Sequence, residues 1–98
     1  MRGVRARGVD CHIGSQLTRL GPLAAALRQV AGLYRMLRAE GHPLEWLDAG
    51  GGLGIRYQDE APPSPDRWAA TVRASTRETG ATVLVEPGRV LVGNAGVL

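Results

Sequence analysis

The stretch that decides the fold is residues 44–57, LEWLDAGGGLGIRY. Its apolar start predicts a β-strand, and the strand runs into three consecutive glycines, Gly50, Gly51 and Gly52. Glycines at the end of a strand remove every side chain from a tight turn, so backbone N–H groups can converge on an anion such as phosphate. The alternative is a flexible loop that needs positive φ angles, and the glycines alone do not separate these two interpretations.

Two further motifs follow strand-like segments on either side of this stretch. The motif HIGSQ, residues 12–16, ends a segment, residues 9–13, in which apolar and polar side chains alternate. The motif EPGR, residues 86–89, follows the apolar segment 82–85, whose composition is typical of a strand buried on both faces. All three motifs are therefore predicted at the carboxyl ends of strands.

The segment between the first two strands predicts a helix. It is opened by Gly21 and Pro22 and stopped by Gly41. One apolar face is expected from residues that recur at spacings of four and three: Leu23, Leu27, Val30, Tyr34 and Leu37.

A second helix is predicted after an acidic, proline-rich surface loop, residues 58–65. Asp66 is expected to cap this helix and Gly80 to end it. Its inward-facing residues are expected to be Trp68, Ala69 and Val72. The remaining residues 90–98 predict a brief helix or turn, followed by the start of a strand.

The order β-α-β-α-β favours right-handed crossovers between parallel strands. Both helices would then cover one side of a three-stranded parallel sheet, and the three motifs would meet at its carboxyl edge. Folds of the α/β class place their sites at this edge, and in a closed (β/α)₈ barrel the loops after late strands commonly hold phosphate. A dinucleotide-binding unit fits poorly, because Ile55 stands where that fingerprint has its last glycine and no helix follows directly.

Composition excludes several classes of function. The 98 residues suit one small domain, and 44% of them are apolar. All 12 basic residues are scattered arginines and the net charge is only +3, so we expect no nucleic-acid partner. No apolar run is long enough to span a membrane, and the single cysteine, Cys11, fits a reducing, cytoplasmic compartment. Cys11 and His12 would point to opposite faces of a strand, which makes a poor metal pair.

Three segments carry a resemblance to a known family. They are GVDCHIGSQLT (residues 8–18), HPLEWLDAGGGLGIRY (residues 42–57) and LVEPGRVLVGNAGVL (residues 84–98). In this order they resemble the late barrel strands of diaminopimelate decarboxylases, which are pyridoxal-phosphate enzymes of the alanine-racemase-like fold class. The resemblance implies the last three βα units of a (β/α)₈ barrel. It also implies pyridoxal 5′-phosphate as cofactor and decarboxylation of meso-2,6-diaminopimelate to L-lysine and CO2.

The resemblance also assigns roles to the first two motifs. His12 matches the family histidine that stacks on the coenzyme ring, and Ser15 matches a serine that donates its hydroxyl to the phosphate. Gly50, Gly51 and Gly52 match the turn that offers backbone donors to the same phosphate. Without the resemblance, a strand histidine and a serine after glycine would be interpreted as packing and turn residues.

In the third motif, Glu86 matches the acid beside the coenzyme's ring nitrogen, where a carboxylate favours the protonated ring. Arg89 matches an arginine that binds the substrate, since its planar fork suits a carboxylate. Pro87 and Gly88 would shape the turn that aims both side chains into one pocket. The resemblance thus gives His12 and Glu86 as the catalytic residues, whereas surface ion pairs are the plain alternative for the acid and the arginine.

Two departures from the family stand out. Its coenzyme is held by a lysine on the first barrel strand, and this sequence contains no lysine. Its C-terminal β-domain, which completes the site across a homodimer, has no counterpart here. We therefore expect an internal segment that is inactive alone. Two alternatives stay open: a related ornithine or arginine decarboxylase, and a module that binds the coenzyme or phosphate without catalysis.

Overall fold

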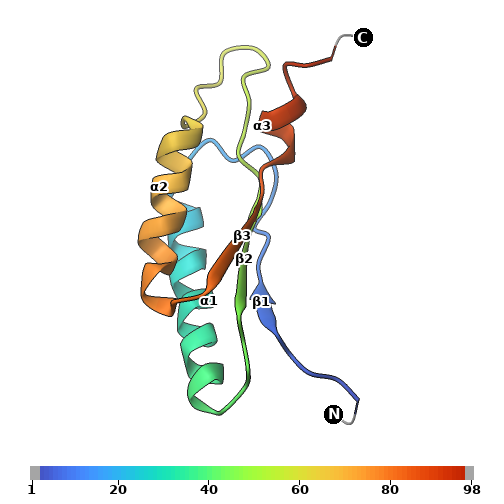
Figure 1. Ribbon diagram of the computed structural model, residues 1–98. Coiled ribbons are helices and arrows are strands. Elements are labelled where there is room, and N and C mark those ends of the chain that lie inside the picture. Colours follow the sequence, from blue (N-terminus) through green and yellow to red (C-terminus); the bar gives the residue numbers. More distant parts are fainter. Residues whose placement is uncertain (1–2, 97–98) are drawn as a thin grey trace.

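The structure, a computed structural model, describes residues 3–96. Strands and helices alternate along the chain as predicted (Figure 1). The elements are β1 (Gly8–Asp10), α1 (Gly21–Ala39), β2 (Trp46–Gly51), α2 (Pro65–Thr76), the 3-10 turn η1 (Arg77–Thr79), β3 (Thr82–Glu86) and α3 (Gly88–Val92).

The three strands form one parallel sheet in the order β1-β2-β3. Val9 lies beside Leu47, and Leu47 lies beside Val83, so the strands are in register at their centres. Both long helices cover the same face of the sheet, and the carboxyl ends of the strands point together towards α3 (Figure 1). The predicted β-α-β-α-β order, with both helices on one side, is confirmed.

The hydrophobic core lies between the sheet and the two helices. The predicted face of α1 is confirmed, since Leu23, Leu27 and Tyr34 are buried and Val30 and Leu37 pack against the core. The strand side and α2 supply the other large apolar side chains of the core: Leu44, Leu47, Leu53, Trp68 and Val72. The predicted inward position of Ala69 is wrong, because this residue is exposed and lines the open groove beside α2 instead of the core.

The ends of the helices follow local chemistry. Gly41 adopts a φ of +93° after α1 and Gly80 a φ of +66° after η1, so both glycines stop their helices as predicted. The predicted cap of α2 is wrong by two residues. Ser64 is the cap, and its hydroxyl accepts a hydrogen bond from the Arg67 N–H at 3.3 Å. Pro65 then takes the first helical position, where its missing N–H costs nothing, and this moves Asp66 into the first turn.

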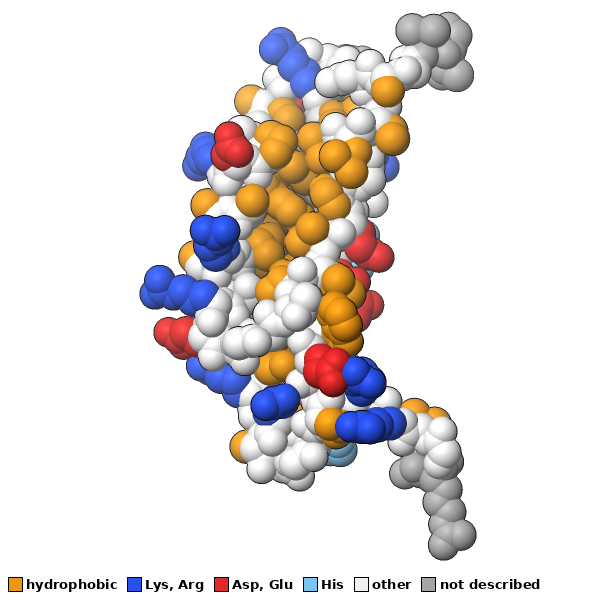
Figure 2. Space-filling view, viewed as in Figure 1, with side chains coloured by type: hydrophobic (Ala, Val, Ile, Leu, Met, Phe, Trp, Pro, Cys, Tyr) orange, Lys and Arg blue, Asp and Glu red, His pale blue; other side chains and the backbone are white. Residues whose placement is uncertain are grey.

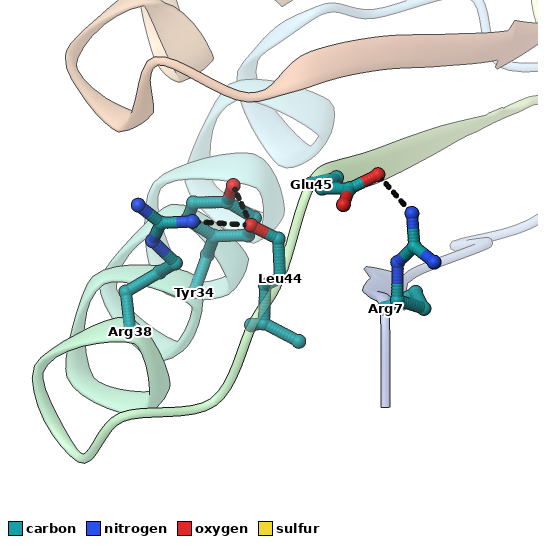
Figure 3. Close-up of polar contacts among 5 residues, drawn as sticks. All are labelled: Arg7, Tyr34, Arg38, Leu44 and Glu45. Atoms are coloured by element: carbon teal, nitrogen blue, oxygen red, sulfur yellow. Dashed lines mark hydrogen bonds and ion pairs between the residues drawn. The ribbon is translucent and has the colours of Figure 1, made fainter. Parts of the chain in front are cut away.

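At the amino end of the sheet, side chains tie the chain together (Figure 3). The Tyr34 hydroxyl and the Arg38 guanidinium both donate to the buried carbonyl of Leu44, at 3.0 and 2.7 Å. The Arg7 guanidinium pairs with the Glu45 carboxylate at the surface. These contacts hold the start of β2 against α1 and β1.

The prediction that β3 is buried on both faces is wrong. Leu84 is 43% exposed and Val85 is 45% exposed. Trp46, at the start of β2, is 39% exposed on the face that carries no helix. Parallel strands are normally covered on both faces, but among residues 3–96 nothing covers this one.

An apolar groove runs between α2 and the edge of β3 (Figure 2). It measures about 340 Å³ and is lined by residues that include Trp68, Val72, Val83 and Val85. The radius of gyration is 15.2 Å, against about 13 Å for a compact domain of this length. The described chain is therefore a two-layer slab whose second sheet face and β3 edge are open.

Two boundaries differ from the sequence prediction. β1 ends at Asp10 and leaves Ile13 exposed, although the Cys11 N–H still bonds the Asp48 carbonyl at 3.1 Å. The brief helix expected after residue 90 is α3, but residues 93–96 form a turn and no strand, and residues 97–98 lie outside the described part. No helix in residues 3–96 is long and apolar enough to cross a bilayer.

Candidate functional site

The candidate site is the carboxyl edge of the sheet, where the chain leaves three parallel strands. The segments that follow β1 and β2 run side by side there, and Leu17 forms a parallel bridge with Leu53. The Leu17 N–H donates to the Gly52 carbonyl at 2.7 Å, and the Gly54 N–H donates back to the Leu17 carbonyl at 3.0 Å. This pair of hydrogen bonds fixes the loop after His12 against the glycine turn.

A bulge in β2 shapes the glycine turn. Asp48 lies beside Leu84, but Gly51 lies beside Glu86, so β2 has one residue more than β3 over this interval. Gly50 takes up the extra residue with a φ of +67°, a conformation that glycine adopts without strain. The Asp48 carboxylate accepts the Gly50 N–H at 2.8 Å and braces the turn.

Backbone packing explains why glycines stand here. A Cβ at Gly51 would lie 2.0 Å from the Glu86 carbonyl oxygen, and one at Gly50 would lie 2.4 Å from the Cys11 carbonyl oxygen. A Cβ at Gly52 would lie 2.0 Å from the carbonyl oxygen of Gly14. Any side chain would therefore push apart the segments that follow the strands. The turn has the positive φ angles of the flexible-loop interpretation, but it is clamped on both sides.

His12 lies against this turn. Its Nδ1 accepts the Gly51 N–H at 3.4 Å, which leaves the imidazole proton on Nε2 in the neutral ring. The N–H groups of Gly50 and Gly51 thus both have partners within the chain. The arrangement in which all three glycine N–H groups point at an anion is not the one the structure adopts.

The remaining predicted residues occupy the neighbouring positions. Glu86 ends β3 in register with Gly51, and its side chain is exposed. Pro87 is the N-terminal flanking residue of α3, and Gly88 and Arg89 form the first turn of that helix. Ser15 is exposed in the loop after His12 and, among the described residues, its side chain makes no hydrogen bond to the others. The structure therefore gathers the glycine turn, His12 and Glu86 at one edge, and Ser15 lies at its margin.

One residue of the HIGSQ motif, Gln16, received no role from the sequence. Gln16 has a φ of +54°, which is rare for a residue with a side chain, and it is half-buried. Its Nε2 donates to the Ile55 carbonyl at 2.5 Å, and its Oε1 accepts the Ile55 N–H at 3.2 Å. The Arg89 guanidinium also donates to this Oε1, at 3.3 Å. Only a tertiary contact requires this backbone conformation, so no local pattern could have revealed it.

The surroundings of Cys11 disfavour its thiolate form. Partial burial, reinforced by the carboxylates of Asp10 and Asp48, raises the pKa of the Cys11 thiol and keeps it protonated. Residues 3–96 contain no group of three His, Cys, Asp or Glu side chains placed to hold a metal ion. The chemistry available at the edge is thus that of an imidazole, a carboxylate, a guanidinium and a hydroxyl.

Known proteins resemble this chain over most of its length. Residues 2–93 match the family described as pyridoxal-dependent decarboxylase, pyridoxal binding domain. Diaminopimelate decarboxylase of Pseudomonas aeruginosa is 48% identical over 91 residues, which are 93% of this chain and 22% of that protein.

Solved structures share the fold. The crystal structure of diaminopimelate decarboxylase from Helicobacter pylori complexed with L-lysine superposes with a TM-score of 0.82 at 34% identity, covering 87% of this chain and 22% of that one. The lysine/ornithine decarboxylase from Vibrio vulnificus complexed with cadaverine gives a TM-score of 0.75 at 29% identity, covering 88% and 24%.

The chain spans about a fifth of the length of the curated relatives it matches. Nearly all of the chain lies within the family match, and the matched domain is the one that binds the pyridoxal coenzyme. The expected cofactor, pyridoxal 5′-phosphate, is confirmed at the level of the family. The chain belongs to the pyridoxal-dependent decarboxylases, as part of their pyridoxal-binding domain.

Proposed function

We propose that this chain forms part of the coenzyme-binding (β/α)₈ barrel of a diaminopimelate decarboxylase, which converts meso-2,6-diaminopimelate to L-lysine and CO2. The observation that carries the proposal is the meeting of His12, the glycine turn and Glu86 at one sheet edge, in a chain 48% identical to such an enzyme. The open sheet face and the open edge of β3 are the surfaces that further barrel strands and helices would cover.

The residues at the edge fit the coenzyme. A guanidinium and a hydroxyl suit the anionic groups of the coenzyme and its substrate, a carboxylate suits a ring nitrogen, and an imidazole suits a ring face. All four side chains are exposed and can take up a ligand. The glycine turn places no side chain between His12 and Glu86, because a Cβ there would collide with backbone.

When bound, the coenzyme supplies the electron sink that decarboxylation needs. In this proposal Glu86 holds a proton on the ring nitrogen through its negative charge, and the His12 imidazole fixes the plane of the ring. The Gly51 N–H orients that imidazole by donating to Nδ1.

The proposal assigns the anion-binding roles to the other residues at the edge. Ser15 donates its hydroxyl to the phosphate. Because the N–H groups of Gly50 and Gly51 bond within the chain, these two glycines and Gly52 contribute mainly space and backbone surface at the phosphate end. Pro87 and Gly88 turn the chain so that Arg89 can bind the substrate carboxylate.

The sequence contains no lysine, so a covalent link to the coenzyme must come from elsewhere in the enzyme. We expect the 98-residue chain alone to show no decarboxylation with added pyridoxal phosphate. The test therefore uses a hybrid enzyme, in which this chain replaces the matching 91 residues of the Pseudomonas aeruginosa enzyme. The hybrid should bind pyridoxal phosphate and release CO2 from diaminopimelate faster than from ornithine or arginine.

Two substitutions test the assigned roles in the hybrid. Replacing Glu86 with alanine should lower kcat by about a hundredfold or more, because a group that stabilises developing charge is lost. His12→Ala should weaken coenzyme binding. Matched controls are Glu40→Ala and His42→Ala, which change exposed residues of the same types at the far end of the sheet.

The outcomes separate the candidates. A soluble hybrid that binds the coenzyme but decarboxylates none of these amino acids would favour the non-catalytic module. A preference for ornithine or arginine would move the assignment to the related decarboxylases. Equal loss of activity in the Glu86 and Glu40 variants would remove Glu86 from the site. Sedimentation of the hybrid checks the further proposal that the whole enzyme is a homodimer.

A further inference from the structure

The carboxyl edge contains one residue with more site contacts than any role assigned above explains. Gln16 has a strained backbone conformation, with φ at +54°. This conformation places its side chain between the three segments that leave the strands. Strain of this kind persists only when the surrounding contacts fix it. The contacts of the Gln16 side-chain amide therefore indicate which interactions maintain this conformation.

The amide group satisfies the backbone of Ile55 completely. Its Nε2 donates to the Ile55 carbonyl and its Oε1 accepts the Ile55 N–H, so both polar groups of that residue are paired. This pairing also fixes which end of the amide is the oxygen, because the Ile55 carbonyl can only accept and the N–H can only donate. The loop after β1 is thereby tied to the segment that leaves the glycine turn.

The same oxygen reaches the third segment. Arg89 donates from Nη1 to the Gln16 Oε1 at 3.3 Å, and α3, which carries Arg89, packs on Ile55. A Cβ at Gly93, the residue that caps the carboxyl end of α3, would lie 2.6 Å from Cδ1 of Ile55, which shows how closely the end of the helix approaches. Gln16 thus contacts the segments after β2 and β3 from the segment after β1.

We propose that Gln16 is a positioning residue. Its Oε1 holds one nitrogen of the Arg89 guanidinium beside Ile55 and leaves the remaining N–H donors free for an anion. The inference rests on the proposed function, in which Arg89 binds the carboxylate of the amino-acid substrate. A long, exposed arginine loses side-chain entropy when it binds, and an anchor at one nitrogen reduces that loss before the substrate arrives.

Two variants of Gln16 separate this role from a purely structural one. Gln16→Leu removes every polar contact of the side chain. Gln16→Glu keeps an oxygen that accepts from Arg89 and from the Ile55 N–H, but it loses the donor to the Ile55 carbonyl. Both variants lose the donor to the Ile55 carbonyl, and only the leucine variant also releases the Ile55 N–H and the arginine. Gln29→Leu, on the exposed side of α1, is the matched control.

In the hybrid enzyme, we expect Gln16→Leu to raise KM for diaminopimelate about tenfold with kcat changed less than about threefold, as for the loss of one hydrogen bond to a charged group. Gln16→Glu should keep KM within about threefold of the parent, because the charge-assisted contact to Arg89 remains. Both variants should lower the urea midpoint, and Gln16→Leu, which alone loses the acceptor for the Ile55 N–H, should speed hydrogen exchange at that amide. An unchanged KM in the leucine variant, or an equal rise in both variants, would overturn the proposal.

A readout that does not depend on activity keeps the two proposals distinguishable. A double-mutant cycle of Gln16→Leu and Arg89→Leu compares urea midpoints in the hybrid. Non-additive midpoints support the contact even if the hybrid proves inactive, in which case only the proposed function fails. Additive midpoints show that Arg89 does not depend on Gln16 and reject the positioning role.

Discussion

The two ends of the sheet are held together by different means. At the amino end, the start of β2 is fixed by side chains, with Tyr34 and Arg38 on the Leu44 carbonyl and Arg7 on Glu45 (Figure 3). At the carboxyl end, backbone lies directly on backbone, with glycines where a Cβ would come within 2.0–2.4 Å of a carbonyl oxygen. At the amino end, one side-chain hydrogen bond can be lost while another remains. At the carboxyl end, the glycines leave no space for a side chain.

This difference predicts how strongly each end of the sheet restricts substitutions. The amino end has two donors on one carbonyl, so the loss of either leaves the other in place. At the carboxyl end, the His12 ring and the end of β3 at Glu86 both lie directly against Gly51, which has no side chain. Substitutions should therefore have large effects at the carboxyl end and graded, partly compensated effects at the amino end.

The largest effect is expected for Gly51→Ala. The new Cβ would lie 2.0 Å from the Glu86 carbonyl oxygen, so β2 and β3 must separate at the bulge. We expect a loss of about 3 kcal/mol or more in the free energy of unfolding, at the upper end of overpacking substitutions. The urea midpoint of the hybrid enzyme, followed by circular dichroism, measures it.

Gly32→Ala is the matched control for that substitution. Gly32 lies within α1, and a Cβ there would meet no atom within 4 Å. Alanine is the better helix former, so this variant should gain about 0.5–1 kcal/mol. If both glycine variants shift the midpoint alike, close backbone packing is not what sets the carboxyl end apart.

A smaller effect is expected at the Leu44 carbonyl. Tyr34→Phe removes one of its two donors, and Arg38→Met removes the other. Each single variant should lose about 1 kcal/mol or less, because the remaining donor still satisfies the carbonyl. The double variant leaves a buried carbonyl unpaired and should lose about 1–3 kcal/mol more than the sum of the two.

Urea midpoints of the four proteins in this cycle test the claim of redundancy. Simple additivity would mean that water or another group replaces the lost donors. The contrast with the carboxyl end would then rest on the glycines alone.

The thiol of Cys11 gives a chemical test of the carboxyl end. Partial burial and the carboxylates of Asp10 and Asp48 raise the pKa of Cys11, so at pH 8 we expect alkylation by iodoacetamide to be several-fold slower in the folded hybrid than in urea. Mass spectrometry of the tryptic peptide 8–19 follows this cysteine alone. Asp10→Asn should restore part of the rate, and an equal rate in folded and unfolded protein would show that the thiol is not desolvated.

The sign of the accompanying pH dependence follows from the same shift. Below the ordinary pKa of a thiol, both states keep the proton and the free energy of unfolding does not change. As the pH rises past that value, the unfolded thiol ionises first, since the pKa of Cys11 is higher in the folded state. The free energy of unfolding therefore falls with rising pH until the folded thiol ionises too.

The sequence was sufficient for features set by local pattern. The apolar spacing of α1 and the stops at Gly41 and Gly80 appear as predicted, because periodicity and glycine conformation act within a few residues. Ser64 took the capping role expected of Asp66 because the extended backbone at residue 64 precedes a proline suited to the first helical position. The choice between two capping candidates that lie two residues apart depends on that backbone angle.

The remaining features depend on partners distant in the sequence. The positive φ of Gln16 is imposed by Ile55 and has no local signature. The bulge in β2 appears only when its register with β3 is known. The exposure of Trp46 and Leu84 depends on what covers the second face of the sheet, and apolar composition does not say which neighbours do so. The meeting of the three motifs was predictable because parallel strands share one carboxyl edge.

The smallest effect is expected for Arg7→Ala. The ion pair with Glu45 is half-exposed, with each side chain 48% accessible, and pairs of this kind contribute about 0.5 kcal/mol or less. The Arg7 carbonyl would still accept the N–H groups of Glu45 and Trp46 at 2.7 and 3.1 Å, so the backbone keeps β1 in place. The urea midpoint of the variant should match that of the parent within about 0.5 kcal/mol, and 0.5 M salt should reduce even this difference by screening. A loss above about 1 kcal/mol that salt does not reduce would show that a single side chain, rather than the backbone beneath it, fixes the amino end of the sheet.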